Sequence, residues 1–191
     1  MNLDAERIVA EARAMVVAGG VESLSLRRLG RRLGVSAPAL YFHVDSKAAL
    51  LRAIAEGEVA RLAERFEAID QPDPLDRIRA QSRAYVTYAR ENPELFQVLL
   101  LAPPDLGVAP LPAGAALPAT TNAFAAASSA IDDAIESGAI VADDPLLVAL
   151  TLWSGAHGVA SVLQLGFGLP AALEEAMVDE ITDRILAGYR T

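Results

Sequence analysis

The sequence has no cysteine, two histidines and few aromatic side chains, which make up 5% of its 191 residues. Without cysteine the chain can form no disulfide bond, no thiolate nucleophile and no thiolate metal site. Its only imidazoles are those of His43 and His157, and it has no glycine-rich phosphate loop and no closely spaced set of metal ligands. Acidic pairs such as Asp132-Asp133 are typical of solvated surface. The sequence therefore predicts a protein that is not an enzyme and that holds no cofactor and no metal.

The N-terminus also lacks the basic-then-apolar order of a secretion signal. Asn2-Leu3-Asp4 lead directly into a charged amphipathic helix. Small secreted domains commonly depend on disulfide bonds, which this chain cannot form. Both observations predict a cytoplasmic protein.

The net charge is −9, which taken alone disfavours binding to nucleic acid. The charge is unevenly distributed, however. Residues 1–50 hold seven basic and five acidic side chains, so this part carries +2 and residues 51–191 carry −11. A basic N-terminal part on an acidic body orients the chain toward a polyanion.

One long segment has no charge of either sign. Residues 145–173 contain no Asp, Glu, Lys or Arg, and the run is longer than the roughly 20 apolar residues that span a bilayer. Polar side chains such as Ser154 and His157 interrupt it. Acidic pairs, Asp143-Asp144 and Glu174-Glu175, flank it where a membrane helix needs Lys or Arg on one side. We expect a helix buried on most sides, with a membrane span as the less favoured alternative.

Helical periodicity, interrupted by Pro and Gly, extends along the whole chain, and no segment alternates as a strand would. The fold class is therefore predicted to be all-α, with three helices in an N-terminal domain at residues 1–46 and a second helical domain at 47–191. The Pro- and Gly-rich residues 102–118 are expected to form an irregular loop, either a lid or a plain connector. Outside the motif described next, the expected helices cover residues 3–18, 46–68, 75–92, 94–101, 119–137, 145–167 and 170–189.

A short basic segment near the N-terminus predicts two helices joined by a tight turn. Leu26, Leu29 and Leu33 lie at helical spacing, and Ser25 precedes them as an N-cap. Gly34 suits the left-handed residue that ends such a helix. A turn of this kind, between helices set at about 90 to 120°, is typical of the helix-turn-helix, whose second helix enters the major groove of DNA.

The second helix of the pair is expected to begin at Ser36, with Pro38 in its first turn. Its exposed N-terminal end presents Ala37, Ala39 and Tyr41, and small side chains there allow a helix to approach the groove closely. The positive charge that faces the phosphates comes from Arg27, Arg28, Arg31 and Arg32. The alternative interpretation is a solvated basic face beside an ordinary helix corner.

Lys47 lies in the first turn of the following helix, which Ser46 is placed to cap. A cation at this end is opposed by the helix dipole, at a cost of a few tenths of a kcal/mol. A phosphate bound there would be stabilised by the free N–H groups and by the ammonium. We therefore expect Lys47 to contact a DNA phosphate.

This segment carries a family resemblance. The run Ser25-Leu26-Arg27-Arg28-Leu29-Gly30, then Leu33-Gly34-Val35-Ser36-Ala37-Pro38-Ala39-Leu40-Tyr41-Phe42-His43-Val44, then Ser46-Lys47-Ala48-Ala49-Leu50-Leu51, resembles the N-terminal domain of the TetR (tetracycline-repressor) family of transcriptional regulators. The resemblance spans residues 8–54. It implies that Leu40 and Val44 pack in the domain core and that Tyr41, His43 and Lys47 touch the DNA backbone. The expected DNA-binding residues are Ser25, Arg27, Arg28, Ser36, Ala37, Pro38, Ala39, Tyr41, His43 and Lys47.

A second, less specific resemblance lies toward the C-terminus. The patterns Trp153-Ser154-Gly155-Ala156-His157-Gly158 and Tyr88-Ala89-Arg90-Glu91-Asn92-Pro93-Glu94-Leu95-Phe96 resemble the sensor domain of TetR-family members with a Trp…His-Gly signature. This implies a pocket for a small, largely apolar effector. Aromatic residues at helical spacing are more often plain core, and an isolated histidine is more often structural, so that interpretation stays open. The candidate pocket residues are Tyr85, Tyr88, Phe96, Phe124, Trp153 and His157.

The last two helices predict a homodimer. The helix from Pro145 has one face of small residues, which permits close helix approach, and one face of larger residues. Pairing with a second copy would build a four-helix bundle across a two-fold axis, which suits a palindromic DNA site. The small face comprises Thr151, Ser154 or Gly155, Gly158 and Val162; the larger face comprises Leu146, Leu150, Trp153, His157 and Ala160; the final helix contributes Leu173, Met177, Ile181 and Ile185.

The sequence thus predicts a DNA-binding regulator, a repressor that a small effector releases from a palindromic operator, with no membrane partner. The alternative is an all-α ligand carrier or a dimeric structural protein that does not bind DNA. A salt-sensitive gel shift separates these classes, because phosphate contacts make DNA binding depend on salt.

Overall fold

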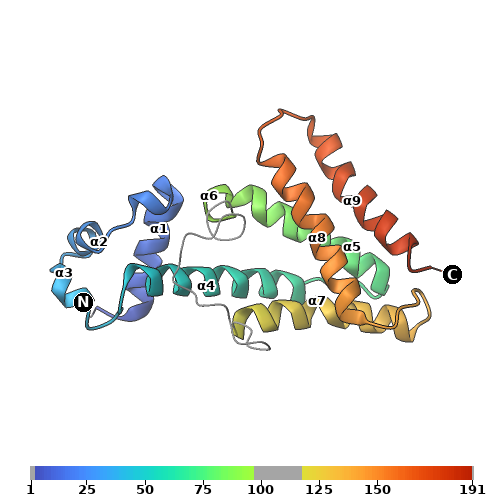
Figure 1. Ribbon diagram of the computed structural model, residues 1–191, viewed down its shortest axis with the longest axis horizontal. Coiled ribbons are helices and arrows are strands. Elements are labelled where there is room, and N and C mark those ends of the chain that lie inside the picture. Colours follow the sequence, from blue (N-terminus) through green and yellow to red (C-terminus); the bar gives the residue numbers. More distant parts are fainter. Residues whose placement is uncertain (1–2, 97–117, 191) are drawn as a thin grey trace. The chain divides into compact units, whose positions relative to one another are not determined.

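The computed structural model describes residues 3–96 and 118–190, with side chains in α7 from residue 127 onward. Every regular element in these residues is a helix, which confirms the all-α prediction (Figure 1). The helices are α1 (Ala5–Ser23), α2 (Leu26–Leu33), α3 (Ala37–Leu40), α4 (Lys47–Glu67), α5 (Pro74–Glu91), α6 (Pro93–Leu95), α7 (Pro118–Glu136), α8 (Pro145–Leu163) and α9 (Ala171–Ala187). Most of the loop expected at 102–118 lies outside the described residues, and its last residue begins α7.

The chain divides into two compact units. The first contains the residues up to Glu58 and the segment that begins at Asn92, and the second contains Val59–Glu91 and the residues from Pro118 onward. The division passes through α4, so this helix contributes to both units. The division expected at residues 46 and 47, between a DNA-binding part and an effector-binding part, concerns function and stays a prediction.

Helix α1 begins and breaks where the sequence predicts. The side chain of Asp4 caps it by accepting a hydrogen bond from the backbone N–H of Arg7 at 2.8 Å. The helical backbone is interrupted at Gly19 and Gly20, where Gly20 has φ 67°, and a short turn continues to Ser23. Glycine is the residue that adopts this conformation without steric cost.

The predicted pair of capped helices is present in the first unit. Ser25 Oγ accepts a hydrogen bond from the N–H of Arg28 at 3.2 Å and begins α2, and Gly34 ends it in the left-handed conformation at φ 73° and ψ 27°. Ser36 Oγ accepts from the N–H of Ala39 at 3.4 Å and begins α3. The local chemistry of these side chains therefore sets the bounds of the helix-turn-helix.

The core of the first unit draws on a segment far along the chain. Ile8, Leu29, Leu40 and Leu50 are fully buried together, and Leu95 of α6, 1% exposed, belongs to the same cluster. Helix α6 also packs against α1. A helix near this position is predicted from the sequence, whereas its packing in the N-terminal core is not.

A buried ion pair joins the same elements. Arg13 of α1 donates to both carboxylate oxygens of Glu58 in α4, from Nε at 2.5 Å and from Nη2 at 3.1 Å. Arg13 Nη2 also donates to Asn92 Oδ1 at 3.4 Å, just before α6. Glu58 is 4% exposed, so Arg13 supplies hydrogen bonds that water would give to an exposed carboxylate.

The second unit is built around α5, which packs against α7, α8 and α9. Ile78 of α5, Val148 of α8 and Leu186 of α9 lie in one buried cluster. Ion pairs run between α5 and α9 at the surface, such as Arg79 Nε to Asp183 Oδ1 at 2.7 Å. Apolar burial therefore holds these four helices together, and the exposed pairs add little.

Helix α8 is the charge-free segment singled out in the sequence. It is the one helix among the described residues that is long and apolar enough to cross a membrane, with mean hydropathy 1.7 and 33% of the window buried. One side packs in the core through Val148 and Leu152, while Leu146, Leu150 and Trp153 are 39 to 57% exposed. The helix is therefore buried on one side only, and the expectation of burial on most sides is not met within a single chain.

Candidate nucleic-acid interface and ligand site

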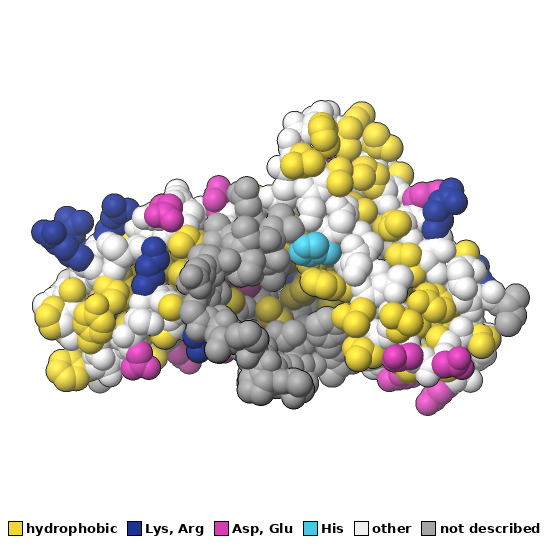
Figure 2. Space-filling view, viewed as in Figure 1, with side chains coloured by type: hydrophobic (Ala, Val, Ile, Leu, Met, Phe, Trp, Pro, Cys, Tyr) yellow, Lys and Arg dark blue, Asp and Glu magenta, His cyan; other side chains and the backbone are white. Residues whose placement is uncertain are grey.

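The arginines of α2 lie at the surface of the first unit, as predicted. Arg27, Arg28, Arg31 and Arg32 are exposed, and Figure 2 shows Lys and Arg side chains gathered over this helix. Two of the four have partners within the chain: Arg28 Nη1 donates to the backbone oxygen of Ser23 at 2.7 Å, and Arg32 pairs with a carboxylate of α1. The exposed positions give α2 a positive surface suited to phosphate contacts.

Helix α3 presents a mixed surface. Ser36, Pro38, Tyr41 and His43 are exposed, whereas Ala37 and Ala39 are half-buried. Opposite them Leu40 is fully buried and Val44 packs against the core of the first unit, which agrees with the placement that the family resemblance implies. Most of the side chains of α3 that are expected to meet DNA are therefore exposed, on a helix that packs against α2.

One residue of this surface was missed by the sequence analysis. Phe42 is 89% exposed, more than any other large apolar side chain among the described residues. Its position in the sequence indicates this exposure, because Phe42 lies midway between Leu40 and Val44, which the family resemblance places in the core. Phe42 directly follows the predicted DNA contact Tyr41, and both lie within the segment that resembles the TetR N-terminal domain.

Lys47 has a partner within the first unit. Its Nζ donates to the backbone oxygen of Val21 at 3.1 Å, and the residue is half-buried at the start of α4. Ser46 caps this helix as predicted, since Ser46 Oγ accepts from the N–H of Ala49 at 3.0 Å. The carbonyl of Val21 follows the break at Gly20, so Lys47 ties the end of α1 to the start of α4. Its contact with a phosphate stays a prediction.

In the second unit the structure brings together three of the predicted pocket residues. Tyr85 Oη lies 2.8 Å from His157 Nδ1, and the rings of Trp153 and His157 lie 5.1 Å apart at an angle of 44°. Tyr85 is 5% exposed, and burial raises its pKa to about 12. Burial also lowers the pKa of His157. Both groups are therefore held neutral near pH 7, which suits an apolar neighbour better than a charged one.

The other predicted pocket residues are placed differently. Tyr88 is buried with the guanidinium of Arg65 over its ring, at 5.4 Å from the centroid. Phe96 is fully buried and belongs to the first unit. The side chain of Phe124 lies outside the described residues. The structure thus joins Tyr85, Trp153 and His157, and it gives Tyr88 a cationic neighbour that the sequence did not predict.

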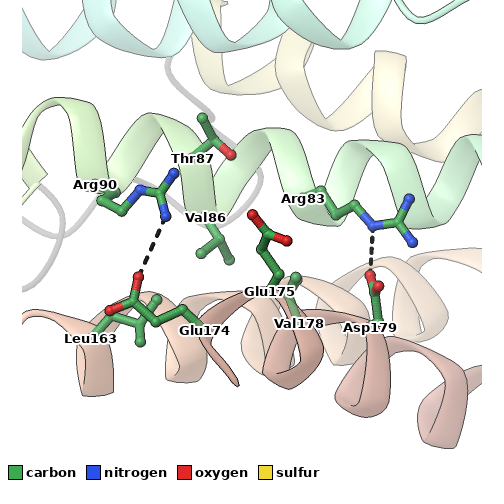
Figure 3. Close-up of a pocket in the computed structure, with 9 residues that line it drawn as sticks. All are labelled: Arg83, Val86, Thr87, Arg90, Leu163, Glu174, Glu175, Val178 and Asp179. Carbon is green, nitrogen blue, oxygen red and sulfur yellow. Dashed lines mark hydrogen bonds and ion pairs between the residues drawn. The ribbon is translucent and has the colours of Figure 1, made fainter. Parts of the chain in front are cut away.

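A pocket of about 310 Å³ lies elsewhere in the second unit, between α5, the end of α8 and α9 (Figure 3). Arg90 and Glu174 approach to 3.4 Å, Arg83 and Asp179 to 2.5 Å, and Glu175 lies between these two pairs. Val86, Thr87, Leu163 and Val178 complete the lining. The sequence identifies Glu174 and Glu175 only as an acidic flank of the charge-free segment, and only the packing of distant helices assembles the pocket.

Comparison with known proteins agrees with both units. Residues 8–54 match the family model of bacterial regulatory proteins, tetR family, and residues 78–188 match the tetracyclin repressor-like C-terminal domain. The tetracycline repressor protein class C of Escherichia coli is 46% identical over 55 residues, 29% of this chain and 25% of that repressor. An uncharacterized HTH-type transcriptional regulator of Mycobacterium tuberculosis is 25% identical over 190 residues, 98% of this chain and 82% of that protein. The solved structure of a protein with unknown function from Rhodococcus sp. RHA1 superposes with a TM-score of 0.81 at 28% identity, covering 100% of this chain and 97% of that one.

The capped helix-turn-helix and the helical second unit define a DNA-binding transcriptional regulator. The chain belongs to the TetR family. Its match to the tetracycline repressor of Escherichia coli covers only a quarter of that protein. The family assignment rests on both family models, and together they account for most of the chain.

Proposed function

We propose that this chain is a repressor that binds a palindromic operator as a homodimer and is released by a small, largely apolar effector. The observation that carries the proposal is the capped α2–α3 pair with its exposed arginines, on a chain whose remaining part is strongly acidic. The acidic part disfavours non-specific contact with DNA, so the first unit alone engages it. The protein acts in the cytoplasm and catalyses no reaction.

In this proposal the predicted DNA-binding residues divide into two groups. Arg27, Arg28 and Lys47, with Ser25, hold the phosphates and set the register of the protein on the duplex. Ala37, Pro38 and Ala39 of α3 face the bases, and Tyr41 and His43 contact the backbone beside them. Phosphate contacts supply most of the affinity and its salt dependence, whereas the side chains of α3 supply the choice of sequence.

The effector site is proposed at Tyr85, Trp153 and His157. Support comes from their contact, from the burial of Tyr85, and from the neutral state that burial favours for both titratable groups. A neutral polar pair beside an indole ring fits a small apolar molecule with one polar group. Release of DNA requires the effector to bind the DNA-free conformation better, and about 2.8 kcal/mol of coupling weakens operator binding a hundredfold.

The dimer is proposed to form through the exposed face of α8. Leu146, Leu150 and Trp153 lie on this face, and the hydroxyls of Thr151 and Ser154 donate within their own helix, each at 2.7 Å to a carbonyl four residues earlier. Covering the face therefore leaves no hydroxyl donor unsatisfied. The two-fold axis of such a dimer matches two half-sites of a palindrome.

One part of the predicted dimer face is used inside the chain instead. A Cβ at Gly155 would lie 2.8 Å from Ile185 Cδ1 and 3.1 Å from Ile181 Cγ1, so α8 and α9 approach closely at this glycine. Gly155, Ile181 and Ile185 are residues that the sequence pattern assigns to contact with a second copy. The proposed contact with a partner therefore rests on the exposed residues of α8 rather than on these three.

A gel shift tests the function as a whole. The full chain is titrated against the DNA that flanks its own gene and against a scrambled duplex, at several salt concentrations. A repressor gives a sequence-specific shift that weakens steeply as salt rises. A carrier or a structural dimer gives no salt-sensitive shift, and that result would refute the proposal.

The dimer has its own test. Replacing Leu150 with Arg buries a charge in the proposed contact and should convert the dimer to a monomer in sedimentation velocity. Leu165→Arg is the matched control, because Leu165 is 68% exposed and lies beyond the end of α8. If Leu150→Arg stays dimeric, the dimer does not form through this face.

A further inference from the structure

The recognition surface of the first unit ends in a nearly bare aromatic ring. Helical hydrogen bonding continues past α3, since the N–H of Val44 donates to the carbonyl oxygen of Leu40 at 2.9 Å. Leu40 and Val44 both face the core of the first unit, so a residue midway between them faces away from it. Phe42 is that residue, and it is 89% exposed.

The exposure of Phe42 is unfavourable in the free protein. Burying a phenylalanine side chain is worth about 1.5 to 3 kcal/mol relative to leaving it in water. Almost the whole side chain of Phe42 is accessible to water, so its contacts with the described residues do not provide this stabilisation in the free protein. Its position on the outward side of the α3 turn, beside exposed Pro38 and Tyr41, is where a duplex would cover it.

We infer that Phe42 is a specificity-determining residue that contacts the C5-methyl group of a thymine in the operator. This inference rests on the proposed role of α3 as the helix in the major groove. A phenyl ring has no donor or acceptor, so it cannot read the hydrogen-bonding pattern of a base edge or bond to a phosphate. The thymine methyl is the apolar group that the major groove offers, and contact with phenylalanine is one way in which proteins recognise it.

The residues around Phe42 strengthen this assignment. Ala37 and Ala39 carry only a methyl group, and the exposed Pro38 has no side-chain donor. The part of α3 that faces outward therefore has little capacity for hydrogen bonds to bases. Sequence selection by an apolar surface of this kind depends on methyl contacts, and Phe42 is the largest apolar side chain available for one.

The test begins with DNA that the full chain selects from a random duplex library. Each thymine of the selected site is then replaced in turn by deoxyuridine, which removes the methyl and leaves the base pair intact. Affinity is measured for the unmodified chain, for Phe42→Ala and for the control Phe167→Ala. Phe167 is also strongly exposed, at 66%, but lies in the second unit.

We expect one thymine of the half-site at which deoxyuridine weakens binding by about fourfold, the value of one buried methyl. In Phe42→Ala the ratio between the thymine and deoxyuridine sites should fall to about one, and in Phe167→Ala it should stay near four. Because the side chain of Phe42 is almost fully exposed, its removal should leave the free energy of unfolding unchanged within about 0.5 kcal/mol.

Two results would overturn the inference while leaving the proposed function standing. One is an operator at which no thymine responds to deoxyuridine. The other is a Phe42→Ala variant that loses affinity equally for the thymine and deoxyuridine sites, which would place the ring against the sugar-phosphate backbone. If the chain enriches no DNA from the library, both the proposed function and this inference are wrong.

Discussion

Removing Arg13 should destabilise the first unit strongly. In Arg13→Met the carboxylate of Glu58, 4% exposed, loses the donors at 2.5 and 3.1 Å that satisfy both of its oxygens. Breaking a buried pair by removing one partner costs about 3 to 5 kcal/mol, because the remaining buried charge loses hydrogen bonds that water does not replace. Methionine retains much of the aliphatic volume of arginine, so the loss reports the charge rather than a cavity.

The double variant Arg13→Met with Glu58→Met separates the pair from its surroundings. Replacing both members by apolar residues of similar size removes the desolvation cost together with the attraction. We expect the double variant to lie within about 1 kcal/mol of the unmodified chain. Asn92, which accepts from Arg13 at 3.4 Å, is half-buried and can turn to water. The double variant should therefore cost far less than the two single variants added together, which is the expected signature of coupling in the double-mutant cycle.

Urea denaturation followed by two probes measures this effect. Far-ultraviolet circular dichroism follows the helices of both units, while fluorescence follows Trp153, the only tryptophan, in the second unit. With a slope of about 2 kcal/mol per molar urea, the single variant should lower the dichroism midpoint by about 2 M. If the dichroism midpoint falls while the midpoint from Trp153 fluorescence stays unchanged, the loss of stability belongs to the first unit.

The exposed pair between Arg32 and Glu11 serves as the control within the same unit. Arg32 is 50% exposed, so Arg32→Met should cost less than about 1 kcal/mol. The reasoning fails if Arg13→Met costs no more than this control. It also fails if the double variant loses as much stability as Arg13→Met alone, because the desolvation of Glu58 would then not be the cause.

Three further outcomes are expected. Lys47 is the only lysine of the sequence, so bound operator should protect its side chain from an amine-reactive acetylating reagent. Lys47→Ala should reduce the salt slope of DNA binding by about one. An unchanged salt slope would show that Lys47 does not contact a phosphate. Burial lowers the pKa of His157, so the unfolded chain binds its proton at higher pH than the folded chain does, and stability should decline as pH falls below about 6.5. His157→Gln should flatten that part of the urea-midpoint profile, and equal pH dependence in both proteins would contradict the assignment. In a spectroscopic titration of the tyrosines, Tyr85 should ionise at about 12, and Tyr85→Phe should abolish that step.

Local chemistry made the helix-turn-helix predictable. The caps at Ser25 and Ser36 and the left-handed turn at Gly34 depend only on residues within a few positions, and all three were confirmed. The contacts that complete the first unit are not local. Arg13 and Glu58 are 45 residues apart, so their pairing follows from the packing of α1 against α4 rather than from any pattern within one helix.

The second unit shows the same limit at its candidate site. The family resemblance predicted that Tyr85 and His157 line a pocket, but they are 72 residues apart and helical periodicity cannot identify which helix packs against which. The small residues of α8 illustrate the ambiguity further. Gly155 correctly indicated a close helix approach, and the helix that approaches is α9 of the same chain, through Ile181 and Ile185. The exposure of Phe42 does not follow from composition or spacing, because an apolar side chain is by itself most typical of a core.

The burial of Leu95 in the first unit affects how the protein folds during synthesis and how its N-terminal part can be joined to another protein. The ribosome adds about 5 to 20 residues per second from the N-terminus, so a nascent chain that ends near Glu58 still lacks one side chain of its N-terminal core. The DNA-binding unit completes its folding only after α5 has been synthesised. A chimaera that joins residues 1–58 to a foreign sensor would have to supply a leucine at this place. Exchange of the N-terminal unit between relatives therefore succeeds only when the α6 segment is exchanged together with it.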